Sequence, residues 1–337
     1  MKCILTGLGG RGLHWLKAMK ARDDVEVAAF VEPFEGSITR AVEQHGVPRE
    51  RIFPSLDEAL SSTQADFVLD VTPPAVHHEV ALKAFAAGLH VLGEKPLSDN
   101  FETAKMVAEA GARAGLKHMI TQNYRFGAQP RTSRKVLGEG LIGAPGQCDV
   151  RFYMPWADFP DTPGTHYVTQ PFMLINDMMV HHFDLMRYVL DQNPVTVQAI
   201  TWNQPWGWHA GDACHAIVFE YASGLRSTHV CVGCAVGSQT SWNGDWRIEG
   251  PGGSLDWDQA GTWYSHLHRA ELKVNRRAVE HLSVKPQEVA MVDEFFAAIR
   301  EDREPECSAR DNLESLRMVF GAIASARSHR KVELNSV

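Results

Sequence analysis

Short apolar segments alternate with helical patterns across residues 1–122. The apolar segments have the composition of β-strands, and the segments between them repeat their apolar positions with the period of an α-helix. This alternation predicts a doubly wound parallel sheet with helices on both faces. The predicted strands are Lys2 to Thr6, Val25 to Val31, Arg51 to Phe53, Phe67 to Val71, His90 to Leu92 and Lys117 to Thr121, and the helices between them include Leu13 to Ala21 and Val76 to Ala87, the latter ended by Gly88.

The pattern changes after Asn123. A helical segment from Pro171 to Leu190 precedes segments in which apolar and polar residues alternate, and turns such as Ala222-Ser223-Gly224 join consecutive segments. Because short turns join antiparallel strands, residues 123–337 are expected to form an α+β domain with a large, mostly antiparallel open sheet. Its predicted strands are Val195 to Trp202, Ala213 to Tyr221, Leu225 to Val236, Trp246 to Glu249 and Thr262 to His268, and its last helices are Gln287 to Arg300 and Ala309 to His329.

The composition is that of a globular protein, with 44% hydrophobic and 22% charged residues among 337. Lysine and arginine number 33 against 41 aspartate and glutamate residues, which gives a formal net charge of −8. An acidic chain with dispersed basic residues is a poor partner for nucleic acid or an anionic membrane. The apolar stretches fall short of the ~20 residues that span a bilayer, and Met1 leads directly into a predicted strand, so a cytoplasmic protein is expected.

A glycine motif stands between the first predicted strand and the first predicted helix, where Gly7 to Gly12 read GxGxxG. In this context Gly7 permits a tight turn, Gly9 lets the backbone approach a pyrophosphate, and Gly12 lets the helix lie close to the strand. Gly10 and Arg11 complete the turn, and the free N–H groups at the start of the helix suit an anion. The motif predicts a dinucleotide-binding site.

Glu32 strengthens that prediction because it ends the second strand, 20 residues after Gly12. An acidic side chain at this place accepts hydrogen bonds from the adenosine ribose hydroxyls. The same carboxylate repels a 2′-phosphate, so NAD is favoured over NADP. Arg11 and Arg40 are basic residues that could weaken this preference.

Polar segments follow the fourth and fifth predicted strands, at the sheet edge where ligands bind in open α/β folds. Lys95 lies beside Pro96, which favours a non-helical turn, at the edge where a nicotinamide would lie. A lysine in this position can hydrogen-bond a substrate hydroxyl, lower its pKa as hydride departs, or exchange the proton itself. The residues assigned to the cofactor at these strand ends are Thr72, Pro73, Pro74, His77, Glu94 and Lys95.

A second group of chemical residues lies in the predicted helix Pro171 to Leu190. Asp177, His181, Asp184 and Tyr188 are spaced i, i+4, i+7 and i+11, which places them on one stripe of a helix. Three interpretations are open: a solvated or structural face, a general base whose imidazole is oriented by a carboxylate, or a weak metal site with His182 as another ligand.

The chain resembles the Gfo/Idh/MocA family, which includes glucose-fructose oxidoreductase and inositol 2-dehydrogenase. The resemblance extends over nearly the whole chain. It is carried by the GxGxxG turn, the Thr72 to His77 and Glu94 to Pro96 segments, the Asn123 to Phe126 run, and the DxxxHxxD of Asp177, His181 and Asp184. Relatives often have glycine two positions after the aspartate, where this chain has Met179.

The resemblance implies a Rossmann domain in residues 1–122, and a substrate-binding and oligomerisation domain in residues 123–337. It also implies that Lys95 binds substrate and handles the proton, that His181 is the catalytic acid/base, and that Asp177 is its partner on the substrate. Aromatic residues in expected loops could stack on sugar rings, Trp156 among them. The expected substrate contacts are Lys95, Asn123, Tyr124, Arg125, Trp156, Asp177, His181 and His182, and no metal is assigned.

These observations predict an NAD-dependent dehydrogenase that oxidises a secondary hydroxyl of a sugar, sugar acid or cyclic polyol. One alternative is glycoside hydrolysis or elimination through transient oxidation by tightly held NAD. The other is a nucleotide-binding regulator without turnover, which would have no need of Lys95, Asp177 and His181. The expected partners are a small carbohydrate or polyol and further copies of the chain in a dimer or tetramer.

Overall fold

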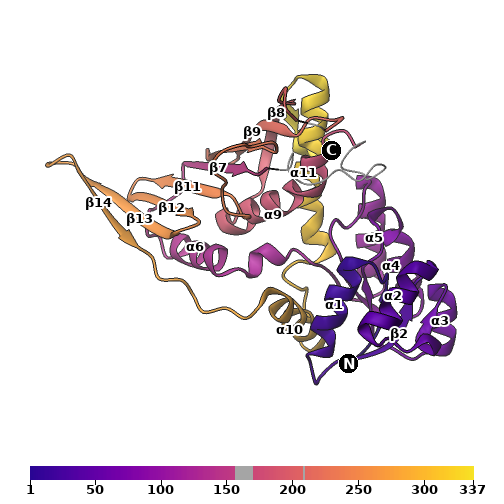
Figure 1. The fold of residues 1–337 in the computed structure, drawn as a ribbon. Helices are drawn as coiled ribbons and strands as arrows, with labels where there is room; N and C mark the ends of the chain where they lie inside the picture. The colour runs from indigo at the N-terminus through magenta and orange to yellow at the C-terminus, as the bar shows by residue number, and fades with distance from the viewer. Residues whose placement is uncertain (156–169, 208) are drawn as a thin grey trace. The chain divides into compact units, whose positions relative to one another are not determined.

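The computed structural model describes residues 1–155, 170–207 and 209–337, and the chain divides into two compact units (Figure 1). Unit 1 comprises Met1–Asn123 and Lys285–Leu313, and unit 2 comprises Tyr124–Val284 and Glu314–Val337. The predicted second domain, residues 123–337, included Lys285–Leu313. This segment belongs to unit 1 because its helix α10 (Gln287–Arg300) packs Phe295 and Phe296 edge-on against Phe67, with ring centroids 5.4 and 5.7 Å away.

Unit 1 is built on a six-stranded parallel sheet in the order β3-β2-β1-β4-β5-β6. The order reverses between β1 and β4, which creates the crevice where dinucleotides bind in such sheets. The predicted doubly wound sheet is therefore confirmed. Its strands are β1 (Lys2–Thr6), β2 (Glu26–Val31), β3 (Ile52–Phe53), β4 (Phe67–Asp70), β5 (His90–Gly93) and β6 (His118–Ile120).

The helices of unit 1 begin and end at residues whose chemistry explains the boundary. Ser55 and Asn100 accept hydrogen bonds from backbone N–H groups in the first turns of α3 and α5, and Gly88 follows α4 with a φ of 75°. Besides α10, the helices are α1 (Gly10–Lys20), α2 (Glu35–His45), α3 (Leu56–Ser62), α4 (His77–Ala86) and α5 (Phe101–Arg113).

Unit 2 contains a nine-stranded sheet in the order β14-β13-β12-β11-β7-β10-β9-β8-β15. β7 pairs with β10 in parallel and every other neighbouring pair is antiparallel, which confirms the predicted mostly antiparallel sheet. The strands are β7 (Gln147–Tyr153), β8 (Pro194–Trp202), β9 (Cys214–Tyr221), β10 (Arg226–Val232), β11 (Asp245–Gly250), β12 (Gly253–Asp258), β13 (Gly261–His268), β14 (Lys273–Ala278) and β15 (Val332–Glu333).

Helices cover one face of this sheet (Figure 1). Phe183 of α9 packs against Phe219 of β9 with ring centroids 5.0 Å apart, and the Ala199 N–H donates to Ser325 Oγ of α11. The helices in this part of the chain are α6 (Ala128–Gly138), α8 (Met173–Asp177), α9 (Met179–Leu190) and α11 (Ala309–Ser328), whose residues from Glu314 onward belong to unit 2.

The single helix predicted from Pro171 to Leu190 is two helices. Met178 ends α8 and begins α9, and the His181 N–H donates to the Met178 carbonyl rather than to the residue four positions earlier. Asp177 and His181 therefore do not share one helical stripe. Every residue of α9 is buried, so the solvated-face interpretation is wrong.

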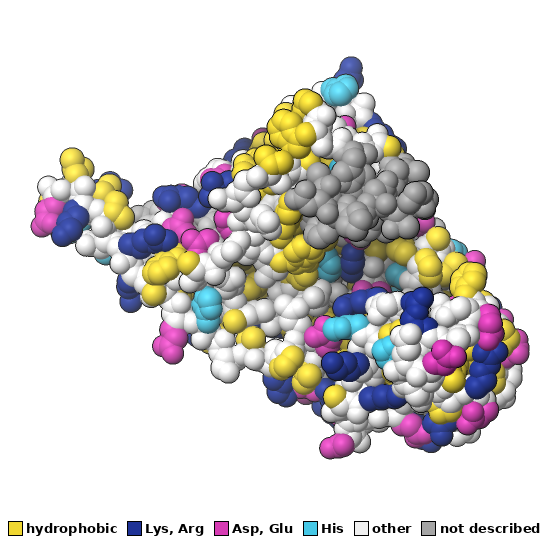
Figure 2. Space-filling model, viewed as in Figure 1, with side chains coloured by type: hydrophobic (Ala, Val, Ile, Leu, Met, Phe, Trp, Pro, Cys, Tyr) yellow, Lys and Arg dark blue, Asp and Glu magenta, His cyan; other side chains and the backbone are white. Residues whose placement is uncertain are grey.

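The surface of the chain mixes basic and acidic side chains, as Figure 2 shows for one face. Among the described residues, none of the helices combines the length and apolar character needed to cross a membrane. Within the same ranges, no set of three histidine, cysteine or acidic side chains is arranged to hold a metal ion.

Candidate active site

The glycine turn of unit 1 has the backbone geometry that a pyrophosphate requires. Gly7 has a φ of 86°, and a Cβ there would lie 2.6 Å from the Val71 carbonyl oxygen. A Cβ at Gly12 would lie 2.0 Å from the Gly7 oxygen, whereas Gly9 and Gly10 face open space. α1 begins at Gly10 with no side-chain cap and no acidic residue in its first turn. Its first N–H groups therefore suit an anionic ligand, and these residues fit a bound dinucleotide.

Glu32 lies at the end of β2, where the sequence placed it, and is buried. Its Oε2 accepts from the Leu8 N–H at 2.8 Å, and its Oε1 accepts from the Phe34 N–H at 3.0 Å. These two bonds fix the carboxylate beside the glycine turn. Each carboxylate oxygen has a second lone pair, so the group retains the capacity to accept from ribose hydroxyls.

Arg11 pairs with Glu94, which follows β5. The Arg11 Nε and the Trp15 Nε1 both donate to Glu94 Oε1 at 2.6 Å, and the guanidinium lies 5.6 Å from the Trp15 ring. The glycine turn and the Glu94-Lys95-Pro96 segment are thus joined by a charge-assisted bond. Trp15 was missed from the sequence, since a tryptophan inside a helical pattern is typical of the core.

Thr72 and His77 form a second group of contacts at this edge. The Asp70 Oδ1 accepts from the Thr6 hydroxyl at 2.9 Å and from the Thr72 hydroxyl at 2.6 Å. His77 starts α4, and both of its ring nitrogens face backbone carbonyl oxygens, those of Thr72 and Pro96. Asp70 was missed because it reads as the polar end of a buried strand.

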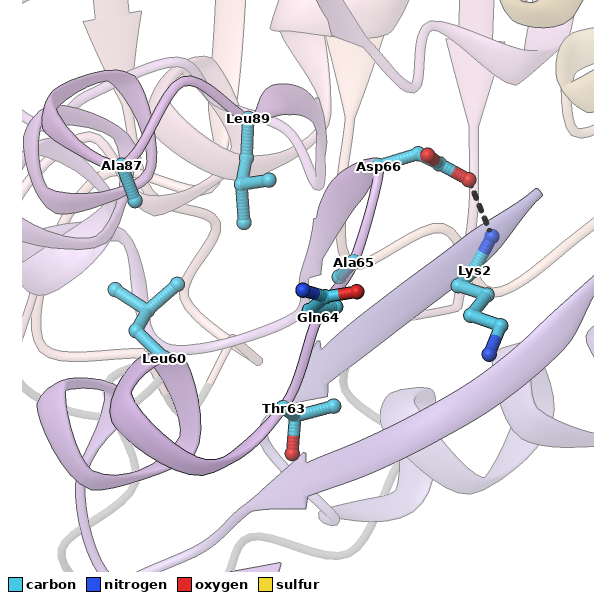
Figure 3. A pocket seen from close by; sticks show the side chains of 8 residues that line it. All are labelled: Lys2, Leu60, Thr63, Gln64, Ala65, Asp66, Ala87 and Leu89. Atoms are coloured by element: carbon cyan, nitrogen blue, oxygen red, sulfur yellow. Dashed lines mark hydrogen bonds between the residues drawn. The ribbon is translucent and has the colours of Figure 1, made fainter.

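Lys95 comes two residues after the last residue of β5, and its own N–H donates to Glu94 Oε2 at 3.3 Å. It therefore lies at the carboxyl edge of the parallel sheet, as predicted. A separate pocket of about 420 Å³ lies at the amino ends of β1 and β4, lined by Leu60, Leu89, Lys2 and Asp66 among others (Figure 3). Since ligands of such sheets bind at the carboxyl edge, this pocket is distinct from the dinucleotide site.

His181 lies in the first turn of α9 in unit 2 and is buried. Its imidazole stacks on the Tyr124 ring, with centroids 4.2 Å apart and planes 10° from parallel. Tyr124, which was predicted to contact substrate, thus lies directly against the predicted acid/base. Asp177 is the last residue of α8 and is only partly buried.

Arg125 has a structural role that the sequence did not reveal. Its Nε and Nη2 donate to the two carboxylate oxygens of Asp184 at 2.5 and 2.6 Å, and both side chains are buried. The Ser315 hydroxyl donates to the same carboxylate at 2.9 Å. The predicted substrate contact of Arg125 stays a prediction, and its guanidinium has a structural partner in this bidentate buried ion pair.

The substrate contact predicted for His182 likewise stays a prediction, while its ring takes part in a buried chain of histidines. It is completely buried, its Nε2 lies 3.1 Å from the Trp242 carbonyl, and its Nδ1 lies 3.0 Å from His229 Nε2. His229 Nδ1 in turn lies 3.0 Å from His215 Nε2. The carbonyl can only accept, so His182 donates to it, His229 donates to His182, and His215 donates to His229.

Burial keeps this histidine chain neutral. It lowers the pKa of His182 to about 4 and that of His215 to about 3, and the pKa of His229 falls well below its usual range. Burial is the largest cause in each case, because an apolar environment disfavours the charged imidazolium. The chain links α9 to β9 and β10 directly beside His181.

Asn123 and Trp156 were also predicted to contact substrate. The Asn123 amide donates to Gln287 Oε1 at 2.7 Å within unit 1, so one of its polar atoms has a protein partner. Trp156 lies outside the described residues.

Comparison with known proteins assigns the family. The model of the oxidoreductase family with an NAD-binding Rossmann fold matches residues 1–122, and the model of the GFO/IDH/MocA C-terminal domain matches residues 131–256. The chain belongs to the Gfo/Idh/MocA oxidoreductase family. The glycine turn and Glu32 are therefore parts of an NAD-binding Rossmann domain.

Members of the Gfo/Idh/MocA family resemble the chain over most of its length. It is 26% identical to the D-apiose dehydrogenase of Paraburkholderia graminis, covering 100% of this chain and 90% of the relative. It is 28% identical to an inositol 2-dehydrogenase of an Arthrobacter species, covering 72% of this chain and 70% of the relative. An Agrobacterium radiobacter oxidoreductase, solved with NAD+, L-tartaric acid and magnesium, shares the fold with a TM-score of 0.86 at 20% identity, covering 100% of this chain and 99% of that one.

Proposed function

We propose that the chain is an NAD-dependent dehydrogenase that oxidises a secondary hydroxyl group of a sugar, sugar acid or cyclic polyol. The observation that carries this proposal is Lys95 at the carboxyl end of β5 in an NAD-binding Rossmann domain. The relatives named D-apiose dehydrogenase and inositol 2-dehydrogenase support the substrate class. Both of those names denote oxidation of polyhydroxylated compounds.

Lys95, His181 and Asp177 have separate roles in the proposed reaction. When bound, NAD supplies the hydride acceptor. The Lys95 ammonium donates a hydrogen bond to the substrate oxygen and lowers the pKa of its hydroxyl. The His181 imidazole takes the proton as the hydride leaves, and Asp177 binds the substrate or orients the imidazole. The stack on Tyr124 restricts the His181 ring to one plane.

Glu32 supports NAD as the preferred cofactor over NADP. Its carboxylate is held at the end of β2 by two backbone N–H groups, and a 2′-phosphate there would place two anions together. Arg11 would not neutralise that repulsion, because its guanidinium pairs with Glu94.

A cytoplasmic location is part of the same proposal. The six cysteines are free thiols, and all are buried. Unpaired thiols are typical of a reducing compartment.

The proposal is tested by supplying purified protein with NAD or NADP and a panel of sugars, sugar acids and inositols, and by following NADH absorbance. We expect NADH to accumulate with NAD and at least one panel member, and not with the Lys95→Ala variant. Product formation without net NADH would instead support hydrolysis or elimination through transient oxidation. Cofactor binding without any turnover of a broad panel would support a regulator.

A further inference from the structure

His77 joins the two turns that follow β4 and β5. The residue is 5% exposed and begins α4. Its Nδ1 lies 2.8 Å from the Pro96 carbonyl oxygen, and its Nε2 lies 2.7 Å from the Thr72 carbonyl oxygen. The imidazole therefore bridges the backbones of the Thr72 and Lys95-Pro96 turns.

The two partners of His77 define its protonation state. A carbonyl oxygen can only accept a hydrogen bond, and a neutral imidazole has one N–H. Either neutral tautomer would leave a nitrogen lone pair facing a carbonyl oxygen within 2.8 Å. Both contacts become hydrogen bonds only when both ring nitrogens carry a proton, which is the imidazolium form.

We propose that His77 is a cationic clamp that holds the Lys95-Pro96 turn against the Thr72 turn and so positions Lys95 for its part in the reaction. This inference rests on the proposed function for the role of Lys95. His77 is a positioning residue, because its ring contacts two backbone carbonyls rather than substrate. Its effect reaches Lys95 through a single peptide unit, since Pro96 follows Lys95 directly.

The Thr72 side of the clamp is fixed to the core of the sheet. The Thr72 N–H and hydroxyl both donate to Asp70 Oδ1, at 3.0 and 2.6 Å, and the Thr6 hydroxyl donates to the same oxygen. Asp70 ends β4 and Thr6 ends β1, the two central strands of the parallel sheet. The Lys95-Pro96 turn is therefore connected to the central strands through His77, Thr72 and Asp70.

The charged and titratable groups on the surrounding elements accommodate a cation at His77. Asp70 at the end of β4 and Glu94 after β5 are carboxylates, and His118 on β6 is neutral because burial, with a smaller contribution from the His77 charge, lowers its pKa to about 3. The remaining groups on these segments are Lys95 beside Pro96, His90 on β5, and His78, Glu79 and Lys83 on α4.

The protonation state is tested by nuclear magnetic resonance of the intact chain labelled with ¹⁵N-histidine, with His77 assigned through its backbone. We expect both His77 ring nitrogens to be protonated at neutral pH. One protonated and one bare nitrogen would overturn the proposal. The resonance measurement needs no substrate, so it tests the protonation of His77 independently of the proposed dehydrogenase activity. The substrate panel tests that activity.

The positioning role is tested with His77→Gln, which keeps an amide donor but has no charge, and with His78→Gln as the matched control. We expect His77→Gln to lower kcat about tenfold while NAD affinity stays within about threefold. The loss should therefore fall on kcat and not on cofactor binding. The control should keep the wild-type kcat and NAD affinity.

Two results with the variant would contradict the positioning role: a kcat like that of the wild type, or a parallel loss of NAD affinity and thermal stability. The second result would mean that His77 supports only the fold. If the variant does not fold, the resonance measurement on the wild type still decides whether the clamp is cationic.

Discussion

Glu32 is the residue on which we expect the choice between NAD and NADP to depend. A Glu32→Gln substitution removes the charge and leaves a single carbonyl oxygen for the two N–H groups of Leu8 and Phe34. We expect NAD affinity to fall and the preference over NADP to shrink, together with a loss of about 1–3 kcal/mol in unfolding free energy from the unpaired donor. Calorimetric titration with both cofactors measures the preference, and Glu43→Gln on the exposed face of α2 is the control. Tighter binding of NADP than NAD to the unmodified protein would refute this role.

Asp184 is the residue whose loss should destabilise unit 2 most directly. An Asp184→Asn substitution leaves the buried Arg125 guanidinium without its counter-charge, and breaking a buried pair on one side costs about 3–5 kcal/mol. The control is Glu102→Gln, which breaks an exposed pair with Lys105 worth about 0.5 kcal/mol or less. Chemical denaturation compares the two variants. Equal stabilities would show that the Arg125–Asp184 pair does not hold α9 in place.

At the scale of elements, the histidine chain makes the attachment of α9 to β9 and β10 sensitive to acid. In the unfolded chain the pKa of His182 and of His215 is 6.5. In the folded chain the pKa of His182 is about 4 and that of His215 is about 3. The unfolded state therefore binds more protons in that interval, and stability is complete above about pH 6.5 and falls as the pH drops. We expect His215→Gln to reduce this dependence in urea unfolding, while the exposed His268→Gln leaves it unchanged. A wild type whose stability is constant from pH 7 to pH 4 would contradict the prediction.

The sequence predicted elements whose patterns are local. The parallel strands, the glycine turn and the Gly88 stop all follow from neighbouring residues, and each lies where it was expected. The break at Met178 was not predictable in this way, since neither glycine nor proline occurs there. The return of Lys285–Leu313 to unit 1 depends on the fit of Phe295 and Phe296 against Phe67, a long-range contact.

The candidate site residues also divide into those that neighbouring sequence reveals and those whose partners are distant in the chain. The motif positions of Lys95, Glu32 and the glycines were visible because the residue type itself carries the function. The partners of Arg125 and His182 were not, since Asp184 and His229 are 59 and 47 residues away in the chain. Both side chains are buried against these distant partners, which residue type alone does not reveal.

At the scale of the whole molecule, the outward face of the nine-stranded sheet predicts self-association. Ile200 and Val218 on this face are 57% and 41% exposed, and the partner of Val218 on β10 is Thr228. Exposed apolar side chains on a broad sheet are typical of an interface between copies. We expect light scattering to report a dimer or tetramer at micromolar concentration, and Val218→Lys to shift it toward the monomer. A monomeric wild type would refute the prediction.

The central claim is that the proton is handled by Lys95 and His181 while the glycine turn and Glu32 bind the cofactor. The most direct test is turnover and NAD affinity of Lys95→Ala and His181→Ala on the substrate that the panel identifies, with the exposed Lys83→Ala and His268→Ala as controls. Turnover should fall by at least ~10²-fold in both variants. NAD affinity should change by less than about tenfold, equivalent to ~1.4 kcal/mol. Near-normal turnover in both variants would contradict the account, even with the fold and cofactor correct.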